Sequence, residues 1–267
     1  VESCHAHNGG GRVRRRTGER MPVICATGIV TRYVNYREND RILSIFTIDH
    51  GRIDAKARGC RRPASPLLPA AQPFVYGEFE LFAGRDKYTV NQCAVEESFF
   101  PIREDIDRFA VGSAMLQLAH EAVQEREPNR PLFSLLYHAL SFLAYAEPLD
   151  PIDLFLCYLL RYLNTIGYCP AVTSCARCGR DLRADTHVYA SARAGGAICA
   201  ACASGAQEIS KTALEAMRRM LLLGDAELYR VRLNDGLRAE LRPFLTELAV
   251  QSLEYGARTL AFLQELR

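Results

Sequence analysis

Hydrophobic and polar residues alternate with a period of two along the first part of the chain, as far as Phe99. The clearest case is 52–58, where Ile53, Ala55 and Ala57 fall on one face and charged residues fall on the other. Other runs are rich in β-branched and aromatic residues, which favours strands. The five strands that we expect are Ala26–Tyr36, Arg41–Ile48, 52–58, Pro73–Phe82 and Lys87–Val95.

Turns and one longer loop separate these strands. A tight turn is expected at 49–51 and another at 84–86, and three prolines make 61–71 a loop. Five short strands in about 75 residues suit a small closed barrel, and an OB-fold is a five-stranded Greek-key barrel of this size. An SH3-like barrel fits the strand count almost as well.

Beyond Phe100 the spacing of apolar residues changes to three and four, which predicts helices. We expect Ser210 to cap one of them at its N-terminus. The apolar helix faces are expected at Ile106, Phe109, Ala110, Ser113 and Leu116; Leu132, Leu135, Leu136 and Ala139; Ile152, Phe155, Leu159, Leu163 and Ile166; Leu214, Met217 and Leu221; and Leu245, Leu248, Ala249, Ser252, Leu253, Leu260 and Leu263.

These patterns predict an α+β multidomain protein. An N-terminal OB-fold β-barrel is expected over 21–100 and a C-terminal helical domain over 101–267, interrupted by a cysteine-bearing module at 171–205. Residues 1–20 contain three successive glycines and a cluster of arginines, and we expect them to be a disordered extension. They have no apolar segment of the secretory type, and the chain has no apolar run of about 18 residues that would span a membrane.

Four of the ten cysteines form two pairs with the same spacing. Cys175 and Cys178 enclose two residues, as do Cys199 and Cys202, and twenty residues separate the pairs. Two intervening residues let both thiolates face one ion, and Gly179 permits the turn that closes the first knuckle. Because four thiolates make a closed tetrahedral shell, the pattern predicts one structural zinc ion per chain, in a zinc ribbon inserted in the helical domain.

Paired cysteines have other roles in proteins. Ten cysteines without an export signal indicate a reducing cytoplasm, which disfavours two disulfides. No βαβ pattern surrounds either pair, which disfavours a thioredoxin-type redox site. An iron–sulfur cluster with four thiolate ligands stays open beside zinc. Cys169 and His187 lie near the pairs, and we expect both to be structural residues rather than ligands.

A cluster of basic residues begins on the third expected strand. Because alternate side chains of a strand share a face, Arg52, Lys56 and Arg58 are expected to project together. Arg61 and Arg62 extend the positive charge into the loop that follows. The formal net charge of the whole chain is only +2, so this local clustering carries the signal for a nucleic-acid partner.

A second group of arginines accompanies the first strand and the turn after it, at Arg32, Arg37 and Arg41. A cationic groove with aromatic platforms can grip a nucleic-acid strand without reading its sequence. Alternatively, the charges simply cover an exposed strand face and the aromatic residues belong to the core. The aromatic residues near these arginines are Tyr33, Tyr36 and Phe46.

No pattern of residues typical of an enzyme is evident. A nuclease or a metal-dependent hydrolase would need an open metal site or clustered carboxylates with a base. The chain has no Walker A loop and no His-Glu-x-x-His motif, and its six histidines are scattered. We therefore expect no catalytic residue. A scaffold that binds only protein partners stays open beside a nucleic-acid-binding protein.

Four segments, in this order, resemble the RecO family of bacterial recombination mediators. Each match is modest, but their order is specific and extends from about residue 22 to residue 222. The segments are Thr27-Gly28-Ile29-Val30-x-Arg32-Tyr33-x-x-Tyr36-x-Glu38-Asn39-Asp40-Arg41-Ile42-Leu43; Ala57-Arg58-Gly59-Cys60-Arg61-Arg62-Pro63-x-Ser65; Gln72-Pro73-Phe74 with Gly77-Glu78-Phe79-Glu80-Leu81-Phe82; and Ile166-Gly167-Tyr168-x-Pro170 leading to Cys175-x-x-Cys178-Gly179.

The resemblance implies an OB-fold, a helical domain that carries a zinc ribbon, and a cytoplasmic, nucleoid-associated DNA repair and recombination function without enzymatic activity. The implied function is to bind single- and double-stranded DNA, to anneal complementary strands and, with RecR, to load RecA onto strands coated by single-strand-binding protein. Some members of the family also bind the C-terminal tail of single-strand-binding protein. The residues expected to contact DNA are Arg32, Arg37, Arg41, Arg52, Lys56, Arg58, Arg61 and Arg62.

The chain departs from the family pattern at Cys60, where a small residue is usual. This departure predicts an additional, oxidisable thiol in the DNA-binding loop. Some members of the family lack the four cysteines of the module, so the resemblance implies that the metal has a structural role.

Overall fold

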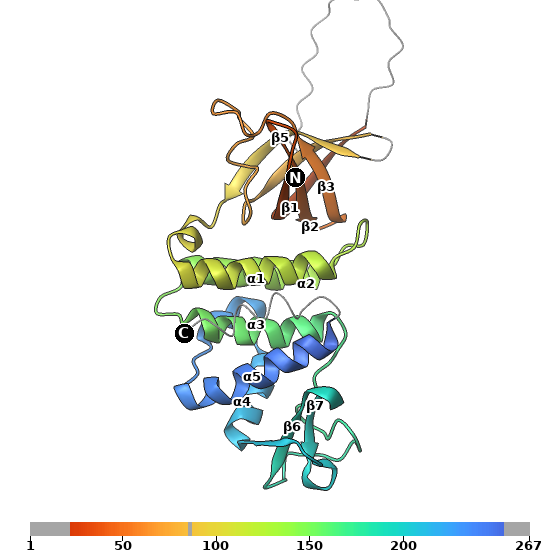
Figure 1. The fold of residues 1–267 in the computed structure, drawn as a ribbon, viewed down its shortest axis with the longest axis vertical. Helices are drawn as coiled ribbons and strands as arrows, with labels where there is room; N and C mark the ends of the chain where they lie inside the picture. Colours follow the sequence, from red (N-terminus) through yellow and green to blue (C-terminus); the bar gives the residue numbers. More distant parts are fainter. Residues whose placement is uncertain (1–21, 85–86, 254–267) are drawn as a thin grey trace, which may run out of the picture.

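The computed structural model describes residues 22–84 and 87–253, in which a β-barrel, a stack of helices and a small three-stranded sheet follow one another along the long axis (Figure 1). The expected extension at 1–20, the centre of the turn at 84–86, and Leu260 and Leu263 lie outside the described residues. In the part that is described, no helix combines the length and the apolar character needed to cross a membrane.

Five strands close the barrel in the order β1-β2-β3-β5-β4. All neighbouring strands are antiparallel except β3 and β5, which run parallel where Ala55 faces Tyr88. The alternation predicted for 52–58 is confirmed, since Ile53, Ala55 and Ala57 are buried inside the barrel. The strands are β1 (Val23–Tyr36), β2 (Asp40–Thr47), β3 (Gly51–Ala57), β4 (Tyr76–Ala83) and β5 (Tyr88–Glu97).

The long strand β1 closes the barrel because it pairs with both β2 and β4. A register shift between Val30 and Arg32 turns the strand, so that its first half follows β4 and its second half follows β2. Gly77 pairs with Gly28 at the crowded part of this seam, and a Cβ atom on Gly77 would lie 2.3 Å from the carbonyl oxygen of Ala94. Glycine is therefore required there for the close approach of three strands.

Five α-helices follow among the described residues, and the residue before each helix caps it with its side chain. Asp105, Asn129, Asp150, Ser210 and Asn234 each accept a hydrogen bond from a backbone N–H in the first turn, and the cap predicted at Ser210 is thereby confirmed. The helices are α1 (Ile106–Ala122), α2 (Arg130–Tyr145), α3 (Pro151–Thr165), α4 (Lys211–Leu222) and α5 (Asp235–Ser252).

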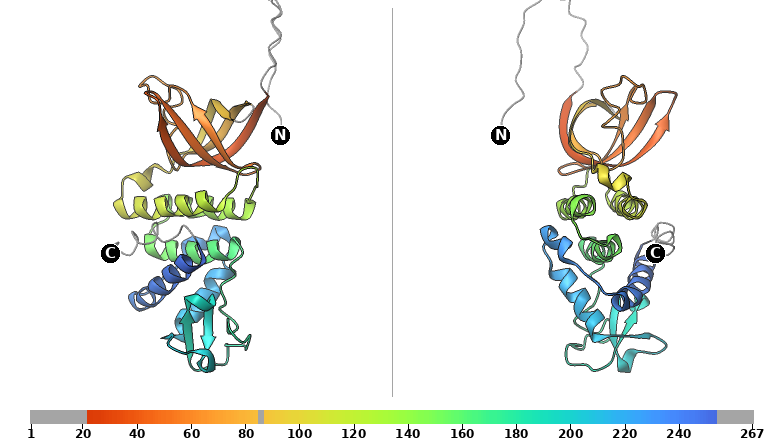
Figure 2. Two further views of the ribbon diagram at one scale, coloured as in Figure 1. Left: turned by 45° about the vertical axis from the view of Figure 1, so that its right-hand side comes forward. Right: turned by 90° about the vertical axis from the view of Figure 1, so that its left-hand side faces the viewer.

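Helices α1 and α2 lie side by side against one end of the barrel, and α3 lies beneath them (Figure 2, right). Phe46 of the barrel packs edge-on against Phe133 of α2, with ring centroids 5.2 Å apart. One hydrophobic core runs from this contact through the helices to the cysteine module, and a second fills the barrel. The barrel and the helical domain are therefore held together by shared apolar packing.

The buried side of α1 differs from the prediction. Ala110 and Leu116 are buried as expected, but Ile106 and Phe109 remain 76% and 43% exposed. Because α1 is packed between the barrel and other helices, residues from most sides of its later turns are buried. The apolar spacing at the start of the helix therefore does not mark a core face.

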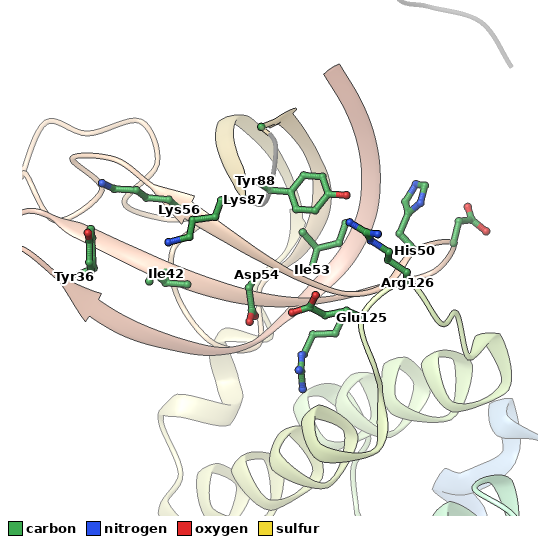
Figure 3. A pocket seen from close by; sticks show the side chains of 13 residues that line it. Tyr36, Ile42, His50, Ile53, Asp54, Lys56, Lys87, Tyr88, Glu125 and Arg126 are labelled. Atoms are coloured by element: carbon green, nitrogen blue, oxygen red, sulfur yellow. The ribbon is translucent and has the colours of Figure 1, made fainter. Parts of the chain in front are cut away.

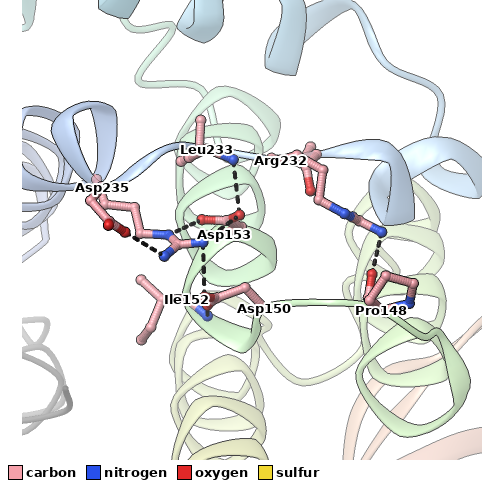
Figure 4. Close-up of polar contacts among 9 residues, drawn as sticks. Pro148, Asp150, Ile152, Asp153, Arg232, Leu233 and Asp235 are labelled. Atoms are coloured by element: carbon pink, nitrogen blue, oxygen red, sulfur yellow. Dashed lines mark hydrogen bonds and ion pairs between the residues drawn. The ribbon is translucent and has the colours of Figure 1, made fainter.

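An ion-pair network around one buried carboxylate joins α3 to α5 (Figure 4). Asp153 of α3 is fully buried, and its carboxylate accepts hydrogen bonds from the guanidinium of Arg238 (Nε···Oδ1, 2.6 Å) and from the backbone N–H of Leu233 (2.9 Å). Asp150 and Asp235 also pair with Arg238, at 2.9 and 3.2 Å. A buried carboxylate needs such partners, so the network fixes where α5 lies on α3.

The cysteine module forms a three-stranded sheet with the order β7-β6-β8. Its strands are β6 (Val188–Ser191), β7 (Gly196–Cys199) and β8 (Gln207–Ile209), so the module extends slightly beyond the expected 171–205. Arg218 of α4 ties the module to the helices through a hydrogen bond from its Nε to the carbonyl oxygen of Val172 (2.7 Å).

Candidate nucleic-acid groove and metal centre

A cavity of about 700 Å³ lies beside β3 and is lined by side chains from β2, β3, the start of β5 and the loop between α1 and α2. We call it the barrel groove. Its cationic side chains are Arg52, Lys56, Lys87 and Arg126, and its lining also includes Tyr36, Ile42, Asp49, His50, Ile53, Asp54, Gly84, Tyr88 and Glu125. Lys56, Lys87 and Tyr36 lie towards one end of the groove, and His50 and Arg126 lie towards the other (Figure 3). The cations and tyrosines together suit phosphates and bases of a nucleic-acid strand.

The loop between α1 and α2 forms one wall of the groove. It pairs with the start of β3, where the backbone N–H of Arg52 donates to the carbonyl oxygen of Gln124 (3.0 Å). Gly51 makes this approach possible, because its φ of +66° suits glycine and a Cβ atom there would lie 2.6 Å from the Gln124 oxygen. The pairing holds Arg126 at the groove, and Arg130 and Asp49 add an ion pair of 2.5 Å beside it.

Two of the predicted DNA contacts, Arg52 and Lys56, line the groove. Lys56 Nζ lies 3.0 Å from a carboxylate oxygen of Asp40 and 4.6 Å from the ring centroid of Tyr36. Arg52 donates from Nη1 to the carbonyl oxygen of His120, the last basic residue of α1 (3.2 Å). Asp54 lies between the two cations along the strand, and with Asp49 and Glu125 it adds negative charge to the groove lining.

The predicted loop arginines lie outside the groove lining. Arg58 and Arg62 are exposed, and Arg61 is exposed while its Nη1 donates to the carbonyl oxygen of Glu38 (2.9 Å). Arg37 is exposed next to the groove residue Tyr36, with its guanidinium carbon 5.4 Å from the ring centroid. These four side chains can extend a path for a phosphate backbone beyond the groove.

The remaining two predicted DNA contacts, Arg41 and Arg32, lie outside the lining of the barrel groove. Arg41 covers the ring of Tyr33 at 3.8 Å and donates to the carbonyl oxygen of Ala71 (2.6 Å), so part of its hydrogen-bonding capacity is used within the barrel. Arg32 lines a separate cavity of about 450 Å³ between β1 and α1, together with His120. The structure therefore does not bring all eight predicted residues to one site.

The aromatic residues also divide. Tyr36 is exposed at the groove, whereas Phe46 is buried, so of the two alternatives left open by the sequence Phe46 belongs to the core. Sequence reasoning missed Lys87, Tyr88 and Arg126. Lys87 and Tyr88 were expected only as the start of a strand, and no sequence signal marks Arg126, which reaches the groove from the helical domain.

His120 is held at the boundary between the barrel and α1. Its Nδ1 lies 3.2 Å from the hydroxyl oxygen of Thr31, and that hydroxyl donates to the carbonyl oxygen of Ser44 (3.1 Å). Burial, followed by the nearby positive charge of Arg52, lowers the pKa of His120 below its usual value. The imidazole is therefore neutral at neutral pH and contributes no positive charge to the groove.

The four predicted cysteine ligands meet in the module. The Sγ atoms of Cys175, Cys178, Cys199 and Cys202 all lie within 4.8 Å of one another, and those of Cys178 and Cys199 are 3.8 Å apart. Zinc–sulfur bonds of about 2.3 Å in a tetrahedron place the sulfurs about 3.8 Å apart. The donor set and its spacing therefore fit one zinc ion.

Backbone N–H groups stabilise the thiolate form of one cysteine, which is the form that binds a metal cation. Burial opposes ionisation of Cys175, but N–H donors from Cys199, Cys178 and Arg177 lower the pKa of its thiol to about 6. Cys202 behaves oppositely, since hydrogen bonding with Cys199 and burial raise the pKa of its thiol to about 12. A bound divalent cation would hold all four sulfurs as thiolates.

The neighbouring cysteine and histidine residues lie outside this cluster. His187 Nδ1 is 2.7 Å from a carboxylate oxygen of Glu208, and Cys169 is exposed in the segment that follows α3. The expected oxidisable thiol at Cys60 is wrong, because Cys60 is fully buried in the barrel and burial raises its pKa.

Comparison with known proteins identifies matches over nearly the whole chain. Residues 21–99 match the family model "Recombination protein O N terminal", and residues 103–260 match "Recombination protein O C terminal". Three similar proteins, each named DNA repair protein RecO, come from Acetivibrio thermocellus, Pelotomaculum thermopropionicum and Desulfitobacterium hafniense. They are 32%, 33% and 33% identical to this chain, over 92%, 91% and 90% of its length and 98%, 94% and 88% of theirs.

Proposed function

The chain belongs to the RecO family of DNA repair and recombination proteins, and we propose that it binds single- and double-stranded DNA in the barrel groove and anneals complementary strands. The observation that carries this proposal is the groove itself, with lysine and arginine side chains at both ends and two tyrosines along it. In our proposal the barrel is an OB-fold. Its order β1-β2-β3-β5-β4 and its parallel contact between β3 and β5 support this assignment.

Annealing by this mechanism requires charge neutralisation rather than catalysis. Two DNA strands repel each other through their phosphates, and side chains that neutralise both lower the barrier to pairing. Lys56, Lys87 and Arg126 would hold a backbone within the groove, and the exposed loop residues Arg58 and Arg62 would hold phosphates outside it. Tyr36 and Tyr88 would stack on bases without reading their sequence. No residue of this mechanism makes or breaks a covalent bond, so we propose a non-enzymatic protein.

The dependence of DNA affinity on salt tests this mechanism. Binding of a fluorescently labelled oligonucleotide, followed by anisotropy, should weaken by orders of magnitude between about 50 and 200 mM salt, because each neutralised phosphate releases counterions. An affinity that does not change with salt would contradict the electrostatic mechanism. Equal affinity for unrelated sequences would support it.

The cysteine cluster would bind one structural zinc ion per chain. Four thiolates leave no open coordination position, so the ion would stabilise the module rather than act on DNA. The module packs on α4 and α5, so its folding supports the C-terminal half of the helical domain. Elemental analysis of the purified protein should give one zinc per chain, and iron instead of zinc would favour a cluster.

We further propose that the protein acts at the nucleoid and has two protein partners there, RecR and single-strand-binding protein. With RecR, the protein would load RecA onto DNA coated by single-strand-binding protein. It would also bind the acidic C-terminal tail of single-strand-binding protein in a cavity of about 550 Å³ between α4, the 3-10 helix η4 (Asp225–Arg230) and α5. Apolar residues including Met220 and Leu233 line this cavity, and its basic residues are Lys211, Arg219, Arg230 and Arg232. Binding of a tail peptide should weaken in Arg230→Glu, which places a repelling charge at the rim.

A further inference from the structure

Exposed apolar side chains gather where the chain passes from the barrel to α1. Phe100, Ile106, Phe109 and Tyr145 are 57%, 76%, 43% and 54% exposed. We call these four residues the junction patch. They are a third of the twelve large apolar residues exposed among those the structure describes, although they come from only two short segments of the chain. Such a concentration of exposed apolar side chains is typical of an interaction surface.

Polar contacts connect the two segments of the patch. Glu97 accepts hydrogen bonds from the hydroxyl of Tyr145 and from the backbone N–H of Phe99, both at 2.8 Å, next to Phe100. Arg108, next to Phe109, donates to the carbonyl oxygen of Ala144 (3.1 Å), next to Tyr145. Ile106 and Phe109 are three residues apart and therefore lie on one side of α1. The four side chains thus belong to one rigid surface.

The charge around the patch is negative. Segments 96–109 and 145–147 contain six carboxylates, at Glu96, Glu97, Glu104, Asp105, Asp107 and Glu147, and only two arginines. Both arginines are turned to the protein: Arg103 donates to the carbonyl oxygen of Ser98, and Arg108 donates to Ala144 and pairs with Glu147. A surface of this charge repels DNA phosphates and attracts a basic partner.

The patch and the barrel groove lie at opposite ends of α1. The patch includes the first turn of the helix, and the α1–α2 loop that forms the groove wall follows its last turn (Figure 1). A helix of 17 residues separates them by about 24 Å at 1.5 Å per residue. A protein could therefore occupy the patch while DNA occupies the groove.

We infer that the junction patch is the docking surface for a folded protein partner that presents basic side chains around an apolar contact. This inference rests on the proposed function, in which the partner is RecR. Apolar side chains at the centre of the surface supply the contact area, and the carboxylates around them set the charge that the partner must match. Docking there keeps the DNA groove open, as a mediator that acts on bound DNA requires.

Calorimetric titration of the full-length protein with RecR from the same source tests this inference. Ile106→Lys removes the most exposed apolar side chain of the patch and adds a repelling charge, and we expect it to weaken RecR binding at least tenfold. Leu222→Lys is the matched control, because Leu222 is 84% exposed at the end of α4, away from the patch, and this variant should bind RecR like the wild type. Asp107→Lys should also weaken binding, and Asp235→Lys in the first turn of α5 controls for its helix position.

Three results would overturn the inference, and they can be told apart. If RecR binds the wild type and Ile106→Lys within twofold of each other, RecR docks elsewhere and the proposed function stands. If RecR does not bind the wild type, the RecR partnership itself is wrong. If the wild type forms a dimer that Ile106→Lys dissociates while RecR binding is unchanged, the patch joins two copies of this chain. Unchanged DNA affinity and melting temperature in Ile106→Lys would confirm that the variant is folded and its groove intact.

Discussion

Arg52 of the barrel donates a hydrogen bond to the carbonyl oxygen of His120 at the end of α1, over 3.2 Å. The same side chain lines the barrel groove, so one guanidinium serves both the interface between the domains and the surface proposed for DNA. Its Nε atom is also buried, without a hydrogen-bond partner among the described residues, so burial of this guanidinium is only partly compensated.

Replacement of Arg52 should therefore affect two properties at once. We expect Arg52→Ala to lower the free energy of unfolding by about 1–2 kcal/mol, because the charged hydrogen bond to His120 is lost, and to weaken DNA binding several-fold. Urea denaturation and oligonucleotide anisotropy measure the two effects. A variant with full stability and reduced DNA affinity would mean that the contact with His120 contributes nothing to the interface.

The cations that do not bridge the domains should affect DNA binding alone. Lys87→Ala and Arg126→Ala should each weaken binding several-fold, similarly for unrelated sequences, and reduce the slope of log affinity against log salt by about 1. Lys211→Ala on α4 is the matched control, since it removes a positive charge outside the groove. Variants of Lys87 and Arg126 that keep both the affinity and the slope would place the DNA elsewhere.

The strands of the barrel were predictable because the alternation of apolar and polar residues in a strand follows directly from burial of one of its faces. On 52–58, one face is buried in the barrel and the other is not, so the alternation of residues reveals the strand. The cysteine cluster was equally predictable, because the spacing of Cys175, Cys178, Cys199 and Cys202 is a local pattern that the fold only has to bring together.

The groove was only partly predictable because it depends on contacts between distant segments. Arg126 reaches the groove because the α1–α2 loop pairs with β3, and no residue pattern near Arg126 predicts that pairing. The apolar spacing of Ile106 and Phe109 led to a wrong prediction of the buried face for a different reason. A helix that is covered on most sides by other elements buries residues outside its apolar stripe, and these two remain exposed.

Loss of the metal should destabilise the helical domain. We expect Cys178→Ser, or treatment with a strong chelator, to lower the melting temperature by about 10 °C, which corresponds to roughly 3 kcal/mol or more in a protein of this size. Cys169→Ser is the control, because this thiol is exposed and lies outside the cluster. Equal melting temperatures for Cys178→Ser and the wild type would show that the cluster holds no stabilising ion.

The buried pair of Asp153 and Arg238 should matter far more than the exposed one that the same arginine makes. Asp153→Ala leaves the partly buried guanidinium and the N–H of Leu233 without their shared acceptor, and should cost about 3–5 kcal/mol of unfolding free energy. Asp235→Ala removes a fully exposed partner of Arg238 and should have little effect on the free energy of unfolding. Comparable losses in the two variants, by urea denaturation, would contradict this assignment of the energy to burial.

We propose that this protein pairs DNA strands by neutralising their phosphates and without catalysis. Annealing of two complementary labelled single strands, followed by fluorescence quenching in the presence of EDTA and without nucleotide, tests it most directly. We expect rapid annealing by the wild type and much slower annealing by a Lys87→Ala, Arg126→Ala double variant of equal melting temperature. A folded wild-type protein that binds zinc but does not accelerate annealing would contradict the claim.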